Sequence, residues 1–98
     1  MQGGEEMMQK LLSVKYVAAE KIALRNLREQ LVVQWEKWGM QRHTFEEWAA
    51  ILNKELAEFN YKVIATKKED GYEELRHCAA VCVAWMIDVL LTQGEAKK

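Results

Sequence analysis

The chain of 98 residues contains no proline, and its glycines are confined to Gly3, Gly4, Gly39, Gly71 and Gly94. These two residue types most often end or interrupt helices, so their scarcity favours long helices. Neither occurs between about residue 5 and residue 38, where apolar side chains recur at helical spacing. The sequence therefore predicts an all-α protein whose first helix covers about residues 5–38. It could form one helix or two with a break near residues 12–16.

Two separate apolar stripes run along this first segment. The earlier stripe contains Met8, Leu11, Ala18, Ala19 and Ile22, with Lys15 among them, and the later one contains Leu24, Leu27, Leu31 and Trp35. Residues 1–4 are expected to fray. Gly39 is expected to end the helix, because glycine readily adopts the left-handed conformation that commonly follows a helix C-terminus.

Two further helices are predicted. Thr44-Phe45-Glu46-Glu47 matches a capping box, in which the Thr44 hydroxyl and the Glu47 carboxylate satisfy free backbone N–H groups. The helix that follows should cover about residues 45–65. A polar loop at 66–71 comes next, in which Asp70 is expected to cap a third helix. That helix should cover about residues 71–92 and end before Gly94, leaving a charged tail.

The third helix is apolar nearly all round between Cys78 and Leu91, as is typical of a helix buried on more than one side. Three helices in one small chain can hardly cover it. We therefore predict that residues 1–98 form a single all-α domain, a bundle of three to four helices completed by homo-oligomerisation into a homodimer or homotetramer.

Charge and composition exclude several classes of protein. With 14 basic and 15 acidic residues, the chain lacks the basic excess of a protein that binds a nucleic acid polymer. No basic segment followed by an apolar run marks a signal peptide. The longest apolar run, Cys78–Ile87, is too short to span a membrane, and Asp88 follows it. Two cysteines one helical turn apart suggest reduced thiols, so a cytoplasmic protein is expected.

Two acidic steps with a spacing of three residues interrupt the second and third helices. These are Glu55-x-x-Glu58 and Glu74-x-x-His77, and each pair leaves one face of a helix. Carboxylates on an apolar face are costly unless a partner such as a divalent cation compensates them. In an antiparallel pair of helices the two steps could converge, although their depths match imperfectly. Oxygen ligands suit Mg²⁺, and an imidazole shifts the preference toward Mn²⁺. Alternatively, Glu55 and Glu58 belong to a solvated face.

Three segments together resemble a known family. They are Trp38-Gly39-Met40-Gln41-Arg42-His43, the run from Trp48 to Glu58, and the run from Glu73 to Trp85. They are similar to the MazG-like all-α nucleoside triphosphate pyrophosphohydrolases, in particular the short branch found in phages and integrons. The resemblance covers about residues 35–90. It implies a Mg²⁺- or Mn²⁺-dependent enzyme that cleaves a nucleoside triphosphate, or its deoxy form, to the monophosphate and pyrophosphate.

The resemblance also assigns roles to residues. The family's metal motif is ExxE on one helix and ExxD on the next, which places Glu55, Glu58 and Glu74 as catalytic and metal-binding residues. His77 stands where the family has Asp, and Lys54 replaces the first Glu of an EExxE run. His77 is either a fourth metal ligand or a histidine bonded to a carboxylate.

Other residues have weaker indications. Lys67, Lys68 and Arg76 are candidates for contacts with substrate phosphates, or else solvated side chains. Trp35, Trp38 and Trp48 should gather near the turn after the first helix, where one could stack on a nucleobase or all could simply pack. Cys78 and Cys82 are expected to be small packing residues rather than zinc ligands, because the ligand set is incomplete.

Two other functions compete with the enzyme. The departures at Lys54 and His77 would suit a catalytically degenerate relative that serves as a helical interaction or structural module. A Glu-x-x-His step plus a glutamate on a second helix, doubled in a dimer, also matches the ligand count of ferritin-like di-metal bundles.

Overall fold

The computed structural model describes residues 2–66 and 71–96. Helix α1 covers Gln2–Trp38, α2 covers Phe45–Phe59, a π-helical segment η1 covers Asn60–Ala65, and α3 covers Tyr72–Ala96. Within these residues no strand is formed. The prediction of an all-α fold is confirmed. Asp70, which was expected to cap α3, lies outside the described residues.

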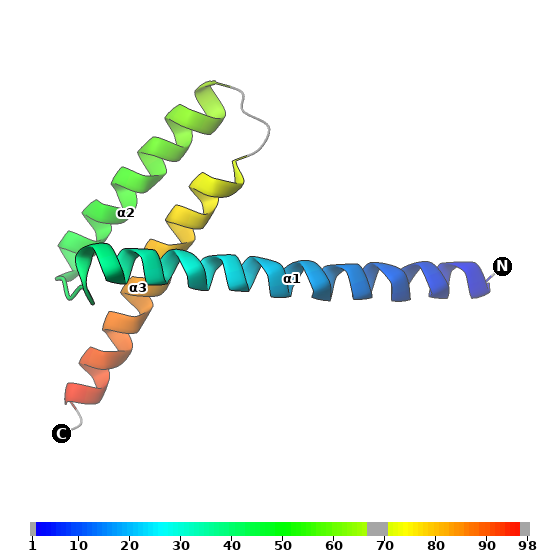
Figure 1. Cartoon of the computed structure of the whole chain (residues 1–98), viewed down its shortest axis with the longest axis horizontal. Helices are drawn as coiled ribbons and strands as arrows, with labels where there is room; N and C mark the ends of the chain where they lie inside the picture. The colour runs from blue at the N-terminus through cyan, green and yellow to red at the C-terminus, as the bar shows by residue number, and fades with distance from the viewer. Residues whose placement is uncertain (1, 67–70, 97–98) are drawn as a thin grey trace.

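The helices α2 and α3 lie side by side and antiparallel as a hairpin, and α1 crosses α3 (Figure 1). Helix α3 contacts both α1 and α2 and is the central element. Among the described helices it alone has the length and composition of a membrane-spanning helix, which the core helix of a soluble bundle also has. The expectation that the apolar segment is too short to span a membrane therefore holds for Cys78–Ile87 but not for the whole of α3.

The first half of α1 projects away from the other helices (Figure 1). The chain extends over 57 × 43 × 23 Å with a radius of gyration of 18.1 Å, whereas a compact domain of this size has about 13 Å. All side chains from residue 3 to residue 25 are exposed. The helix is continuous from Gln2, so the expected fraying of residues 1–4 is wrong for residues 2–4 and the optional break at 12–16 does not occur.

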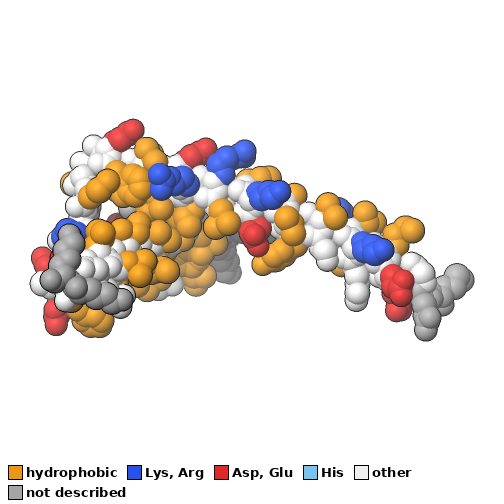
Figure 2. All heavy atoms as spheres, turned by 90° about the horizontal axis from the view of Figure 1, so that it is seen from below, with side chains coloured by type: hydrophobic (Ala, Val, Ile, Leu, Met, Phe, Trp, Pro, Cys, Tyr) orange, Lys and Arg blue, Asp and Glu red, His pale blue; other side chains and the backbone are white. Residues whose placement is uncertain are grey.

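The core lies where the helices meet. Its buried apolar residues come one each from α1, α2 and η1 and two from α3: Leu31, Trp48, Val63, Ala80 and Val81. The Trp48 indole stacks on the Trp85 ring at a centroid distance of 6.4 Å and meets the His43 ring edge-on at 4.8 Å. Many large apolar side chains stay exposed on the hairpin and on α1, as the space-filling view shows (Figure 2).

Local signals fix most helix ends as predicted. Gly39 has a φ of 74°, and its N–H donates to the Trp35 carbonyl at 2.8 Å, which closes α1. Thr44 caps α2 with the full capping box. The predicted end of α3 before Gly94 is wrong, because the helix continues to Ala96. A helical glycine costs only about 1 kcal/mol, and Glu95, in the added turn, pairs with Arg42 at 2.7 Å.

Candidate functional site

The α2–α3 hairpin positions the acidic step of α2. The capping box at Thr44 sets where α2 begins, and Glu55 and Glu58 then fall on a half-buried part of the helix. Cys78 on α3 lies within reach of the charges of both glutamates. Burial raises the pKa of the Cys78 thiol, and the nearby charges of Glu55 and Glu58 raise it further. Glu55 and Glu58 are therefore half-buried and lie within electrostatic reach of α3.

The acidic step of α3 lies on the same helix one turn or less before Cys78. Glu74 and His77 are both half-buried, and one carboxylate oxygen of Glu74, Oε2, is shielded from solvent. Glu55 and Glu58 thus lie close enough to α3 for their charges to act on Cys78, which directly follows His77 and comes one turn after Glu74.

The donor atoms suit a hard divalent cation, since carboxylates of α2 face a helix that carries another half-buried carboxylate. These side chains do not, however, converge as closely as metal coordination requires. In the described part of the chain, no three His, Cys, Asp or Glu side chains form a group that could hold a metal ion. The residues therefore fit a divalent cation by the type of their ligand atoms and not by their present arrangement.

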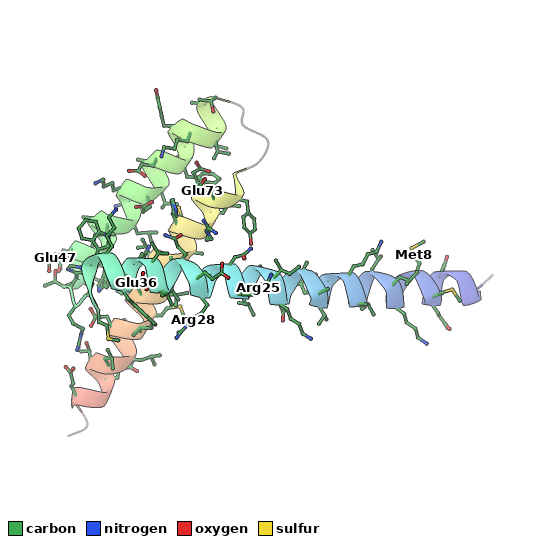
Figure 3. The ribbon with its side chains drawn as sticks, viewed as in Figure 1. Met8, Arg25, Arg28, Glu36, Glu47 and Glu73 are labelled. Atoms are coloured by element: carbon green, nitrogen blue, oxygen red, sulfur yellow. The ribbon has the colours of Figure 1, made fainter. Side chains whose placement is uncertain are left out.

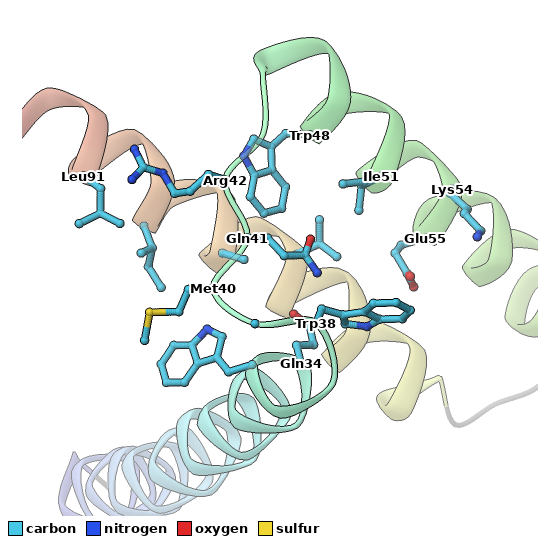
Figure 4. Close-up of a pocket in the computed structure, with 15 residues that line it drawn as sticks. Gln34, Trp38, Met40, Gln41, Arg42, Trp48, Ile51, Lys54, Glu55 and Leu91 are labelled. Carbon is cyan, nitrogen blue, oxygen red and sulfur yellow. The ribbon is translucent and has the colours of Figure 1, made fainter. Parts of the chain in front are cut away.

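A cavity of about 540 Å³ adjoins the acidic step (Figure 4). Its walls come from the end of α1, the turn 39–43, the inner face of α2 and the middle of α3. Trp35, Trp38 and Trp48 all line it, so the expected gathering of these tryptophans is confirmed. Glu55 and Lys54 form its wall on α2. The cavity is thus mainly aromatic and aliphatic, with charged groups at one side.

Gln41 supplies a fixed polar group to this cavity. Its side-chain oxygen lies 2.8 Å from Nε2 of His43, which donates to it in the tautomer protonated there. The Gln41 amide nitrogen is then available to donate to a bound molecule. Trp38 is 62% exposed and Lys37 lies over its ring at 5.1 Å, so this indole forms an open wall of the cavity.

Asp88 holds the turn 39–43 and the start of α2 against α3. It is only 5% exposed. It accepts hydrogen bonds from the His43 backbone N–H at 2.9 Å, from Trp48 Nε1 at 2.7 Å and from Arg42 Nε at 2.7 Å. These bonds, with the His43 N–H contributing most, hold the pKa of Asp88 far below its usual value. The sequence analysis missed this role, although Asp88 is the single charge between Cys78 and Leu91.

Arg42 completes the anchor. Its guanidinium also bonds both oxygens of the Glu95 carboxylate, at 2.7 and 3.2 Å. Its pKa is raised by the hydrogen bonds to Glu95 and then to Asp88. The cavity wall formed by residues 39–42 is thus tied to two points on α3, about two helical turns apart.

The other residues that the sequence singled out lie in different surroundings. Arg76 is half-buried on α3, and its buried Nε has no hydrogen-bond partner among the described residues. Lys67 and Lys68 lie outside the described residues. Cys78 and Cys82 are free thiols, the first half-buried and the second exposed, so the expectation of packing residues holds for Cys78 and is wrong for the exposed Cys82.

No family model, no curated protein and no solved structure matches the chain. The fold and site by themselves define an all-α protein built on a three-helix arrangement with an aromatic cavity beside a carboxylate pair.

Proposed function

We propose that this chain is a cytoplasmic MazG-like nucleotide pyrophosphohydrolase, which hydrolyses a nucleoside or deoxynucleoside triphosphate to the monophosphate and pyrophosphate. One observation carries the proposal. Glu55 and Glu58 are half-buried within electrostatic reach of α3, and Glu55 also lines a cavity of about 540 Å³. Ligand cavities usually measure about 300–1,000 Å³, so a nucleoside has room beside carboxylates that can serve its phosphates.

The aromatic part of the cavity would bind the nucleobase. Aromatic rings bind nucleobases by stacking, and Trp35 and Trp38 line the cavity where a flat ring could lie against them. The Gln41 amide nitrogen, oriented by the bond between its oxygen and His43, would donate to a carbonyl oxygen or a ring nitrogen of the base. These contacts would orient the nucleotide with its phosphates toward α2.

The acidic residues of α2 and α3 would act on the phosphates through a bound cation. Glu55, Glu58 and Glu74, with His77 as a fourth donor, would hold Mg²⁺ or Mn²⁺. The bound cation would neutralise charge on the phosphate oxygens during hydrolysis. A carboxylate not bound to the cation would accept a proton from the attacking water. The water oxygen would form a bond to the α-phosphorus, and pyrophosphate would leave. Lys54, on the cavity wall, and Arg76 would contact phosphate oxygens, together with Lys67 and Lys68.

Pyrophosphate release from a panel of standard and modified NTPs and dNTPs tests the activity, with Mg²⁺ and with Mn²⁺. Glu58→Gln keeps the shape of the side chain and removes its charge, so it should lower the rate at least about hundredfold. Glu73→Gln is the matched control, because Glu73 is an exposed carboxylate on α3 and should not matter. Full activity in Glu58→Gln, or no release from any nucleotide by the folded chain, would contradict the proposal.

A second candidate function is a helical interaction module without catalysis. It is favoured by the absence of a three-ligand group among the described side chains, together with Lys54 and His77 in the motif. Calorimetric titration with Mg²⁺ and Mn²⁺ separates the two functions. Metal binding that Glu55→Gln and Glu58→Gln each weaken supports the enzyme, whereas no metal binding and no pyrophosphate release together support the module.

A further inference from the structure

The two apolar stripes of α1 have different surroundings. The later stripe packs on the rest of the chain, with Leu31 buried and Trp35 half-buried on the cavity wall. The earlier one lies in the projecting half, where every side chain from residue 3 to residue 25 is exposed. At 3.6 residues per turn, Leu11 and Leu31 point roughly 200° apart around the helix axis. The earlier stripe therefore faces away from the hairpin, and none of residues 2–66 and 71–96 covers it.

We propose that an exposed face of α1 formed by Met7, Leu11, Val14, Ala18 and Ile22, which shares three residues with the earlier stripe, packs antiparallel against the same face of a second copy of the chain. The five positions follow one another at spacings of three and four residues, so they share one face of the helix. Met7 is 66% exposed, Leu11 52%, Val14 67% and Ile22 49%. Figure 2 shows apolar side chains continuing along the projecting helix between charged ones.

Charge determines the orientation. Residues 2–14 contain two acidic side chains and one basic one, whereas residues 15–28 contain four basic side chains and one acidic one. In a parallel pair, like charges would meet at every depth. In an antiparallel pair, Glu5 and Glu6 of one copy reach the depth of Lys21 and Arg25 of the other. The helix is therefore complementary in charge to itself only when the second copy is reversed.

Side-chain size agrees with the same arrangement. If the two-fold axis passes near Val14, Met7 of one copy lies opposite Ile22 of the other and Leu11 lies opposite Ala18. The large Leu11 then faces the small Ala18, which allows close packing of the two helices at this depth. Such a pair would also support the projecting half of α1, whose side chains are all exposed from residue 3 to residue 25. In proteins most of the stability of a helix comes from packing of its apolar face. Figure 3 shows Met8 and Arg25 on this bare part of α1.

Sedimentation velocity of the full-length chain over a range of concentrations tests the proposal. The chain should be a dimer, and Leu11→Glu should raise the dissociation constant at least about hundredfold, because it places a charge in an apolar contact. Leu24→Glu is the matched control. Leu24 is also exposed, at 58%, but points to the other side of α1, so this variant should dimerise normally. Circular dichroism should show that both variants retain the helical fold.

Charge reversal tests the orientation. Glu5→Lys with Glu6→Lys, and separately Lys21→Glu with Arg25→Glu, should each weaken the dimer about tenfold. The variant that carries all four changes should recover most of the affinity. A parallel pair would show no such recovery, because like charges would still face each other in the variant with all four changes.

Three outcomes would overturn the proposal. They are a wild-type chain that stays monomeric at all concentrations, equal loss of the dimer in Leu11→Glu and Leu24→Glu, and a dimer that survives Leu11→Glu but is lost in Leu90→Glu. The last result would place the contact on the hairpin, where Leu90 is 65% exposed. The readout is molecular mass, so the proposal stands or falls separately from the proposed enzymatic activity.

Discussion

The indole Nε1 of Trp48 donates a hydrogen bond of 2.7 Å to the carboxylate of Asp88, which joins the first turn of α2 to the second half of α3. Trp48 is 2% exposed and Asp88 is 5% exposed. The same carboxylate accepts the His43 backbone N–H and one N–H of Arg42. One buried acidic side chain therefore positions a core aromatic residue and the turn that forms a wall of the candidate site.

Replacing Asp88 with asparagine should destabilise the fold. The asparagine amide has one acceptor oxygen where the carboxylate has two, so a buried N–H group would lose its partner and Arg42 would lose its buried counter-charge. We expect the midpoint of thermal unfolding, followed by circular dichroism, to fall by about 5–10 °C. Glu95→Gln is the control, because this exposed partner of Arg42 should change the midpoint by less than about 2 °C. Equal midpoints for Asp88→Asn and wild type would contradict the anchoring role.

The stability of the fold should depend on pH through Asp88 and two other carboxylates. The pKa of Asp88 is lowered in the folded chain, and the pKa values of Glu47 and Glu95 are lowered by bonds from Thr44 and Arg42. A carboxyl group of this kind binds protons more readily when the chain is unfolded. Its stabilising contribution is therefore complete above the unfolded pKa of about 4 and is lost as pH falls below it.

Urea unfolding at a series of pH values measures this dependence. The contribution of these groups to the midpoint should be constant above about pH 5 and should decline below about pH 4. Asp88→Asn removes the most strongly shifted group, so its midpoint should decline less over the same acid range. Parallel pH curves for the two proteins would show that Asp88 does not carry the effect.

Gly39 should resist substitution for a conformational reason alone. Its φ of 74° is left-handed, while a Cβ at this position would meet nothing within 4 Å. Gly39→Ala should therefore lower the free energy of unfolding by about 1 kcal/mol, as measured by urea denaturation. Gly94→Ala is an informative comparison, because Gly94 is helical and also has open space around it. That variant should be neutral or slightly stabilising, and a loss equal to that of Gly39→Ala would contradict this explanation.

Trp38→Ala should separate nucleotide binding from folding. The Trp38 side chain is 62% exposed, so its removal should leave the unfolding midpoint nearly unchanged. It also lines the cavity, and loss of a stacked aromatic ring should raise the KM for the nucleotide about tenfold or more. Steady-state pyrophosphate release measures this effect, with Phe45→Ala as a control, since Phe45 is 69% exposed and does not line the cavity. An unchanged KM would place the base elsewhere.

The sequence by itself determined the helices and most of their ends. The left-handed glycine after α1 and the capping box before α2 depend on bonds between residues at most four apart, such as Gly39 to Trp35 and Thr44 to Glu47. Such signals are present in any short stretch of chain. The acidic steps could be recognised in the same way, because their spacing places both side chains on one helix face.

Only the tertiary structure decided which faces meet. It brought Glu55 and Glu58 within electrostatic reach of Cys78, placed the Asp88 carboxylate on Arg42, His43 and Trp48, and left the earlier stripe of α1 exposed. The bonds of Asp88 to that turn and to α2 join residues at least 40 positions apart. They depend on the depth at which α2 and α3 pack and on where α1 crosses them. Those quantities are fixed by the packing of whole helices, so the pattern of residues along any one helix does not contain them.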